Sequence, residues 1–131
     1  MATKKNTTER NYSVNIKFSS KELTPVERVK FKDTTDVTKL DLATKDGDII
    51  ITPDMYVILD IYNEQAKGDK EYEQMIIVDK DGTKYMTGSS NFIDTFMNIA
   101  QELDGMEYEL KIMSKPSKNY AGKTFLTCAV V

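Results

Sequence analysis

The chemistry open to this chain is limited first by the residue types that it lacks. No histidine occurs among its 131 residues, which excludes histidine-based catalytic triads, imidazole general bases and histidine metal ligands. The single cysteine, Cys128, lies in an apolar run and is expected to be an inert core thiol. Glycine-rich phosphate loops are absent, and the acidic turns at 46–48 and 79–82 lack the spacing of a calcium loop. We therefore expect no enzymatic activity, no metal and no cofactor.

The residue types that remain suit the binding of single-stranded nucleic acid. Such binding needs cations along the phosphates and aromatic rings on which bases stack, each stacked base contributing about 1–3 kcal/mol. The chain has seven tyrosines and no tryptophan. Each tyrosine also fits a half-buried position in a sheet, and the cations also fit a solvated strand face. The expected nucleic-acid-binding residues are Arg28, Lys30, Lys32, Lys115, Lys118 and Lys123 for phosphates, and Tyr56, Tyr62, Tyr85 and Tyr120 for bases.

Charge is distributed in three blocks although the net charge is only −3. Residues 1–32 carry eight basic and three acidic side chains, and residues 110–131 carry four lysines and no acid. The middle of the chain, residues 33–109, carries six basic and eighteen acidic side chains. A fold that brought the two ends together would place one basic face on an acidic body.

The elements that must position these residues centre on the stretch from Asp81 to Leu103. Ser89 or Ser90 can cap a helix there, because a serine oxygen accepts a bond from an unpaired N–H of the first turn. Apolar residues then recur at helical spacing, and Gly105 follows as a plausible stop. This spacing predicts the only helix of the chain, which must pack on a sheet or close one end of a barrel.

The rest of the chain reads as strands and loops. Alternation predicts a strand at 12–18 and a second at 28–32, which would bury Val29 and Phe31 and place three cations on its other face. A short element of unsettled type is expected at 39–43. Further strands are expected at 49–52, 55–62, 72–78, 83–87, 106–113 and 123–130, with hairpin turns at 79–82 and 114–122.

This order of strands, hairpin, helix and final hairpin matches an all-β fold of the OB type. An OB-fold is a five-stranded barrel, here with the helix between strands 3 and 4. In that topology the first strand pairs with the fourth, which would bring the two basic segments side by side. We expect one such domain at 12–131, preceded by a flexible arm at 1–11.

The second half of the chain also resembles a known family. Asp81-Gly82, Tyr85, Thr87, Ser90, Phe92, Phe96 and Ile99, the lysine-rich loop at 114–122 and Phe125-Leu126-Thr127-Cys128 resemble the small single-stranded DNA-binding proteins of phages and plasmids from Gram-positive bacteria. The resemblance covers about residues 72–131. It implies an OB-fold and a role in coating single-stranded DNA during replication or conjugative transfer.

Two further expectations concern partners and location. The cationic arm is expected to mediate self-association along DNA, so its deletion should lower cooperativity more than intrinsic affinity. The chain has no apolar run long enough to cross a bilayer and no signal peptide, which predicts a cytoplasmic protein without a membrane partner. The alternative function is an OB-like protein-binding or structural subunit of a phage or secretion apparatus, which would use the acidic middle of the chain.

Overall fold

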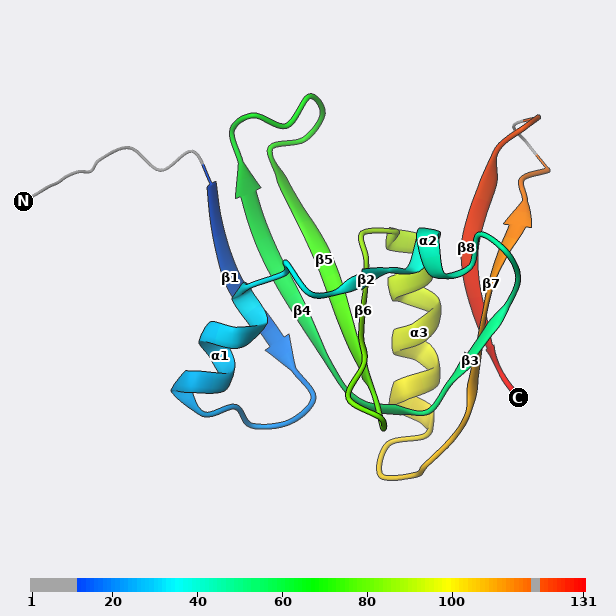
Figure 1. The fold of residues 1–131 in the computed structure, drawn as a ribbon, viewed down its shortest axis with the longest axis horizontal. Coiled ribbons are helices and arrows are strands. Elements are labelled where there is room, and N and C mark those ends of the chain that lie inside the picture. Colours follow the sequence, from blue (N-terminus) through cyan, green and yellow to red (C-terminus); the bar gives the residue numbers. More distant parts are fainter. Residues whose placement is uncertain (1–11, 119–120) are drawn as a thin grey trace, which may run out of the picture.

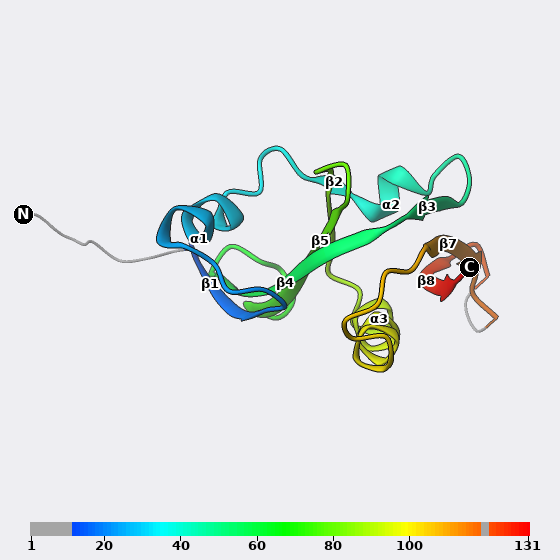
Figure 2. The ribbon, with the colours of Figure 1, turned by 90° about the horizontal axis from the view of Figure 1, so that it is seen from below.

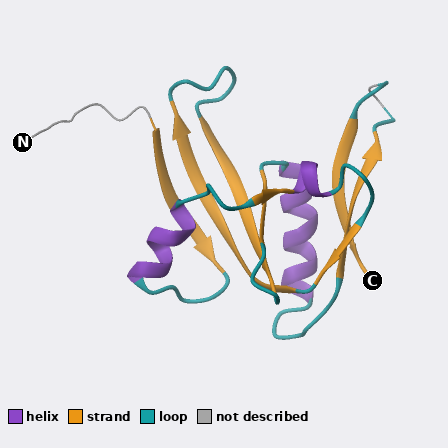
Figure 3. Cartoon of the chain, viewed as in Figure 1, coloured by secondary structure: helices purple, strands orange, loops and turns teal. Residues whose placement is uncertain are grey.

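The computed structural model describes residues 12–118 and 121–131. The expected arm at 1–11 and the expected stacking residue Tyr120 lie outside the described residues. The fold is rich in β-structure, as expected, and consists of two sheets with helices between and around them (Figure 3).

The larger sheet has five strands in the order β1-β4-β5-β6-β2. Its strands are β1 (Tyr12–Ser19), β4 (Pro53–Asn63), β5 (Glu71–Asp79), β6 (Lys84–Thr87) and β2 (Thr38–Lys39). All neighbours are antiparallel except β2, which pairs in parallel with β6. The β5–β6 hairpin and the β4 strand follow the alternation of the sequence, so these predictions are confirmed.

The smaller sheet has three antiparallel strands in the order β3-β7-β8. These are β3 (Ile49–Ile51), β7 (Leu110–Pro116) and β8 (Thr124–Val130). Helix α3 (Ser90–Glu102) lies below the larger sheet and beside β7 and β8 (Figure 2). Phe92 and Phe96 of this helix are fully buried in a core that includes Leu110 and Ile112 of the smaller sheet. The helix is capped by Ser89, whose side chain accepts a bond from the N–H of Phe92, as expected.

One long segment joins the two sheets. Only Thr52 separates β3 from β4, so residues 49–63 run from the smaller sheet into the larger one (Figure 1). The sheets do not close into a barrel, which corrects that expectation. On the edge of β6 where closure would occur, β2 is paired instead. The short helix α2 (Leu40–Ala43) follows β2 and buries Leu40 in the same core as α3.

The expected strand at 28–32 is wrong, because this segment is helix α1 (Pro25–Lys32). Thr24 and Glu27 form a capping box: the Thr24 hydroxyl accepts from the Glu27 N–H, and the Glu27 carboxylate accepts from the Thr24 N–H. Pro25 suits the first helical position because its missing N–H would be unpaired there. The chain thus has three helices in its described part, where the sequence predicted one.

Helix α1 covers the face of the larger sheet opposite α3. Its Phe31 is buried with Val57, Leu59 and Ile76 in a second core. The aliphatic face of β4 is therefore buried, and its other face is partly covered by α3. None of the helices in residues 12–118 and 121–131 has the length and apolar character that crossing a bilayer requires.

The N-terminal strand does not pair with the C-terminal hairpin, so the expected proximity of the two basic segments is wrong. Strand β1 pairs with β4, whereas β7 pairs with β3 and β8. Helix α1 and the β7–β8 hairpin consequently lie at opposite ends of the molecule (Figure 1). The described parts of the two basic segments are therefore far apart instead of side by side.

Candidate nucleic-acid interface

The β7–β8 hairpin presents one face to the core and one to solvent. Leu110 and Ile112 of β7 and Leu126 and Cys128 of β8 are buried in the core that contains α3. Because side chains alternate along a strand, the residues between them point to the opposite face. We call this opposite face the outer face; it consists of Lys111, Met113, Lys115, Phe125, Thr127 and Ala129.

The register places a cation beside an aromatic ring on this outer face. Lys115 is directly opposite Phe125 across the β7–β8 pair, where facing Cβ atoms lie about 5 Å apart. Phe125 is 42% exposed although it is a large apolar residue. An exposed ring gives a base a surface for stacking, and the neighbouring ammonium group gives a phosphate a partner. This pair has the two chemical components that single-strand binding needs.

The lysines at the tip of the hairpin are not neutralised by carboxylates. In the part of the chain that the structure describes, Lys115, Lys118 and Lys123 are exposed and make no ion pair. Lys123 accepts a backbone bond from Ser117, which extends the β7–β8 ladder into the loop. Lys111, farther from the tip, lies 3.7 Å from the carboxylate of Asp48. Positive charge is therefore concentrated toward the tip.

The N-terminal cations have different surroundings. Arg28, Lys30 and Lys32 are exposed on α1, and the last two lie in its final turn, where they complement the helix dipole. Two other cations of the first block are paired with acids: Lys17 with Glu73, and Lys21 with Asp54 at 3.2 Å. These pairs lower the positive potential of this end.

Two of the expected stacking tyrosines pack against the core that contains α3. Tyr56 meets Phe96 edge to face, with ring centroids 5.1 Å apart, and lies 5.8 Å from Phe18. Burial, and then the charge of Asp104, raises the pKa of Tyr56. Tyr85 also packs on this core, and burial raises its pKa. Neither ring lies on the outer face of the hairpin.

Tyr62, the third expected stacking tyrosine that the structure describes, lies in acidic surroundings. It is half-buried near the end of β4, directly opposite Ser13 and Glu71. It lines a depression of about 180 Å³ together with Asp60 and Glu71. Carboxylates repel phosphates, so these surroundings do not favour a nucleic-acid strand.

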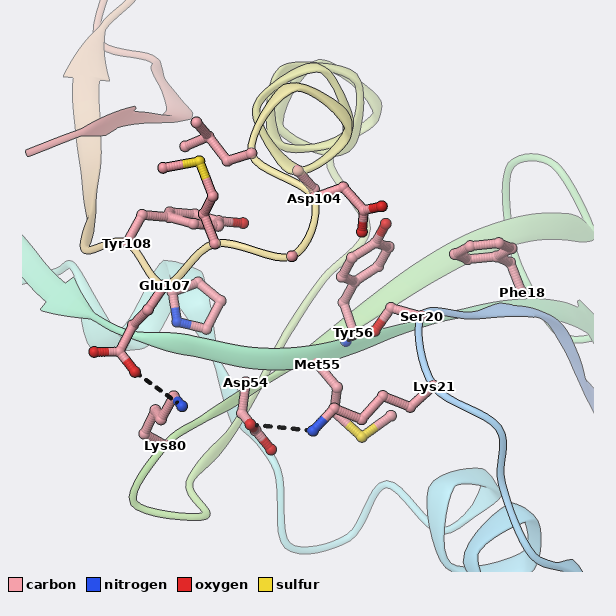
Figure 4. A pocket seen from close by; sticks show the side chains of 15 residues that line it. Phe18, Ser20, Lys21, Asp54, Met55, Tyr56, Lys80, Asp104, Glu107 and Tyr108 are labelled. Carbon is pink, nitrogen blue, oxygen red and sulfur yellow. Dashed lines mark hydrogen bonds and ion pairs between the residues drawn. The ribbon is translucent and has the colours of Figure 1, made fainter.

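A larger cleft of about 490 Å³ lies between β4 and the loop after α3 (Figure 4). Tyr56 and Tyr108 contribute rings, while Asp54, Asp104 and Glu107 contribute carboxylates. Both lysines of the cleft form ion pairs: Lys21 with Asp54, and Lys80 with Glu107 at 2.9 Å. This mixed charge gives a phosphate chain no continuous cationic path.

Sequence reasoning missed Phe125 and Lys111 as outer-face residues. The signal for both is the two-residue period, because burial of Leu126 and Cys128 forces Phe125 outward, and burial of Leu110 and Ile112 does the same for Lys111. Cys128 is buried, as expected, and desolvation raises its pKa to about 11. Among the residues described, no three ligating side chains gather in a way that could hold a metal ion.

Comparison with known proteins adds no relationship. No family model matches the chain, and no curated protein or solved structure is significantly similar to it.

Proposed function

We propose that this protein binds single-stranded DNA without strong sequence preference, and that the outer face of the β7–β8 hairpin is its main contact surface. The observation that carries the proposal is the pairing of exposed Phe125 with Lys115 on the outer face, next to a loop in which Lys118 and Lys123 are exposed. Phosphates would follow the lysines while a base stacks on Phe125. Tyr120 stays an expected stacking residue on the sequence alone, because it lies outside the described residues.

The order of elements from residue 49 onward supports an OB-type fold. If β3 and β4 count as one long first strand, then β5, β6, α3, β7 and β8 follow in the OB order, with the helix between strands 3 and 4. The long strand pairs with β5 in one sheet and with β7 in the other. OB-folds bind oligonucleotides on strands 2 and 3 and through the loops between strands 1 and 2 and between strands 4 and 5. The second of these loops is the lysine-rich tip, residues 117–123.

The segment before residue 49 covers part of the surface that OB-folds use for binding, which favours binding at that tip. One face of β5 and β6 carries Ile76 and Met86, which pack with Phe31 of α1 and with Leu23 and Val37 of the flanking segments. This packing covers much of the face of strands 2 and 3 that OB-folds use to bind oligonucleotides. The outer face of β7–β8 has no such cover among the described residues, because Phe125 and Lys115 remain exposed.

The biological process is proposed from the sequence resemblance alone. It would be the coating of single-stranded DNA in phage or plasmid replication or in conjugative transfer, in the cytoplasm. The protein would then bind DNA without catalysing a reaction on it.

The test is fluorescence anisotropy with a labelled single strand and a duplex of the same sequence, at low and moderate salt. We expect preferential binding of the single strand that weakens as salt rises, because counterions are released from the phosphates. Phe125→Ala should weaken binding by roughly 5- to 150-fold if one base stacks on the ring. Val29→Ala is the matched control, since Val29 is an exposed apolar residue on α1 at the far end of the molecule.

The alternative remains an OB-like protein-binding or structural subunit. The cleft between β4 and the loop after α3 favours this alternative, because Phe18 and Met106 line that cleft and are 44% and 63% exposed. Absence of single-strand binding at low salt, together with retained folding, would reject our proposal and support this alternative.

A further inference from the structure

Strand β8 is an outer strand whose free edge presents unpaired backbone groups. The order β3-β7-β8 gives it a neighbour on one side only within the described residues. Ser117 donates to the carbonyl of Lys123, and Val131 donates to that of Glu109, so odd-numbered residues of this strand point their backbone groups toward β7. The N–H and C=O groups of alternate residues then point to the free edge. These residues are Thr124, Leu126, Cys128 and Val130.

The strand that would pair with this edge in a closed barrel is already paired with another strand. In a closed barrel β8 would pair with β6, but β6 holds β2 on that edge, with Thr38 opposite Tyr85 and Lys39 opposite Met86. The edge of β6 that a closed barrel would use is thus occupied, and β8 keeps a free edge in the described part of the chain. A sheet edge of this kind readily pairs with another chain.

The other outer strands carry features that discourage pairing, whereas β8 carries none. Strand β1 has an irregularity between Ile16 and Phe18 and a charged Lys17 within it. Strands β2 and β3 have only two and three residues. By contrast, β8 extends over seven residues, Thr124–Val130, without charge, proline or glycine. Phe125 and Val130 of this strand are 42% and 47% exposed.

We propose that β8 pairs antiparallel with β8 of a second copy, about a two-fold axis at Thr127. Thr127 is the central residue of the strand, so this register uses its whole length. Leu126 then forms hydrogen-bonded pairs with Cys128 of the second copy, and Thr124 with its Val130. Phe125 faces the small Ala129 of the second copy. No like charges meet, and the interface is the same patch on both subunits, as a two-fold axis requires.

This pairing joins the smaller sheets of the two copies into one sheet of six strands. A two-fold axis perpendicular to the sheet keeps both outer faces on the same side. The Lys115 and Phe125 pairs of the two copies then form one continuous surface. The dimer does not depend on the proposed function, because it is held by backbone bonds and apolar contacts without nucleic acid.

The first test is charge exchange at Thr127, measured by sedimentation without DNA. The wild-type chain should sediment as a dimer. Thr127→Lys and Thr127→Glu should each lose the dimer, because like charges would lie directly opposite one another. An equal mixture of the two folded variants should recover it, since Lys then faces Glu. A monomeric wild-type chain, or a dimer that persists in both variants, would overturn the proposal.

The second test measures the register by cross-linking. The Thr127 residues of the two copies form a non-hydrogen-bonded pair, whose Cα atoms lie about 4.5 Å apart, within disulfide range. Thr127→Cys in a Cys128→Ala background should give a cross-linked dimer on mild oxidation. Ala129→Cys in the same background is the matched control, because its two thiols would be separated by four residues along the strand, about 13 Å. Equal cross-linking of both variants would contradict the Thr127 axis.

Discussion

At the scale of single residues, burial determines the acid–base behaviour of Cys128. Desolvation raises its pKa from 9.0 to about 11, so the folded thiol stays protonated at pH 8. We expect a disulfide reagent to react with it slowly in the folded protein and quickly in urea, where the ordinary pKa returns. Rapid reaction of the folded protein at pH 8 would contradict the burial of this side chain.

The same shift in pKa links stability to alkaline pH. A group whose pKa is higher in the folded state stabilises that state below its unfolded pKa, and this contribution is lost as pH rises toward the folded pKa. The free energy of unfolding should therefore fall between about pH 9 and 11. Cys128→Ala should reduce this fall, as measured by urea unfolding at both ends of the range. Tyr56 and Tyr108, whose pKa values are also raised by burial, remain as a background in both proteins.

The burial of a single residue was predictable from the sequence where a local pattern determines whether its side chain points to the core. Burial of Cys128 follows from its place in an apolar run. The surroundings of Tyr56 did not follow, because its contact with Phe96 joins residues that are forty positions apart. Alternation within β4 indicates on which face of the strand a side chain lies, but it does not indicate which helix covers that face.

At the scale of elements, the start of α1 depends on the capping box of Thr24 and Glu27. Thr24→Ala removes the hydroxyl that accepts from the Glu27 N–H at 3.2 Å, and should cost about 1 kcal/mol of the free energy of unfolding. Thr24→Ser keeps an accepting hydroxyl and is the matched control. Chemical unfolding at neutral pH measures both, and an equal loss in the two variants would exclude the cap as the cause.

The other half of this box responds to acid. Hydrogen bonds from the backbone and side chain of Thr24 lower the pKa of Glu27 from 4.5. A lowered folded-state pKa stabilises the protein above the unfolded pKa, and the contribution is lost as pH falls through the folded value. The stabilisation by Glu27 is therefore present at neutral pH, begins to decline as pH falls below 4.5, and is lost once pH passes the lowered folded-state pKa.

The success of sequence reasoning varied with the element. Helix α3 was predictable because thirteen residues repeat its apolar spacing and a serine caps it. The alternation of Val29 and Phe31 with cations predicts a strand where α1 lies, although the sequence Thr-Pro-Val-Glu carries a helix start signal. Strand β2 and helix α2 are too short for any periodic pattern, and they owe their form to contacts with β6 and the core.

At the scale of the whole molecule, the described parts of the two basic blocks lie at opposite ends. Composition predicted the blocks themselves, but their positions depend on which strands pair. That pairing is a long-range choice: β1 meets β4 at Tyr12 and Asn63, and no local pattern specifies it. The same choice decides which block can act together with exposed aromatic residues.

The final prediction separates the two basic blocks as phosphate-binding surfaces. The double variant Lys115→Gln, Lys123→Gln removes two cations next to Phe125, and Lys30→Gln, Lys32→Gln removes two from α1. Each phosphate contact on a single strand contributes about −0.7 to the slope of log affinity against log salt, so loss of two contacts should reduce that slope by about 1.4. We expect this reduction for the hairpin pair and a slope near that of the wild type for the helix pair.

Both variants change the net charge by the same amount, so a general field effect would alter the two equally. The opposite ranking would move the phosphate path to α1, while an equal loss would mean that the strand responds to total charge and not to the outer face of the hairpin.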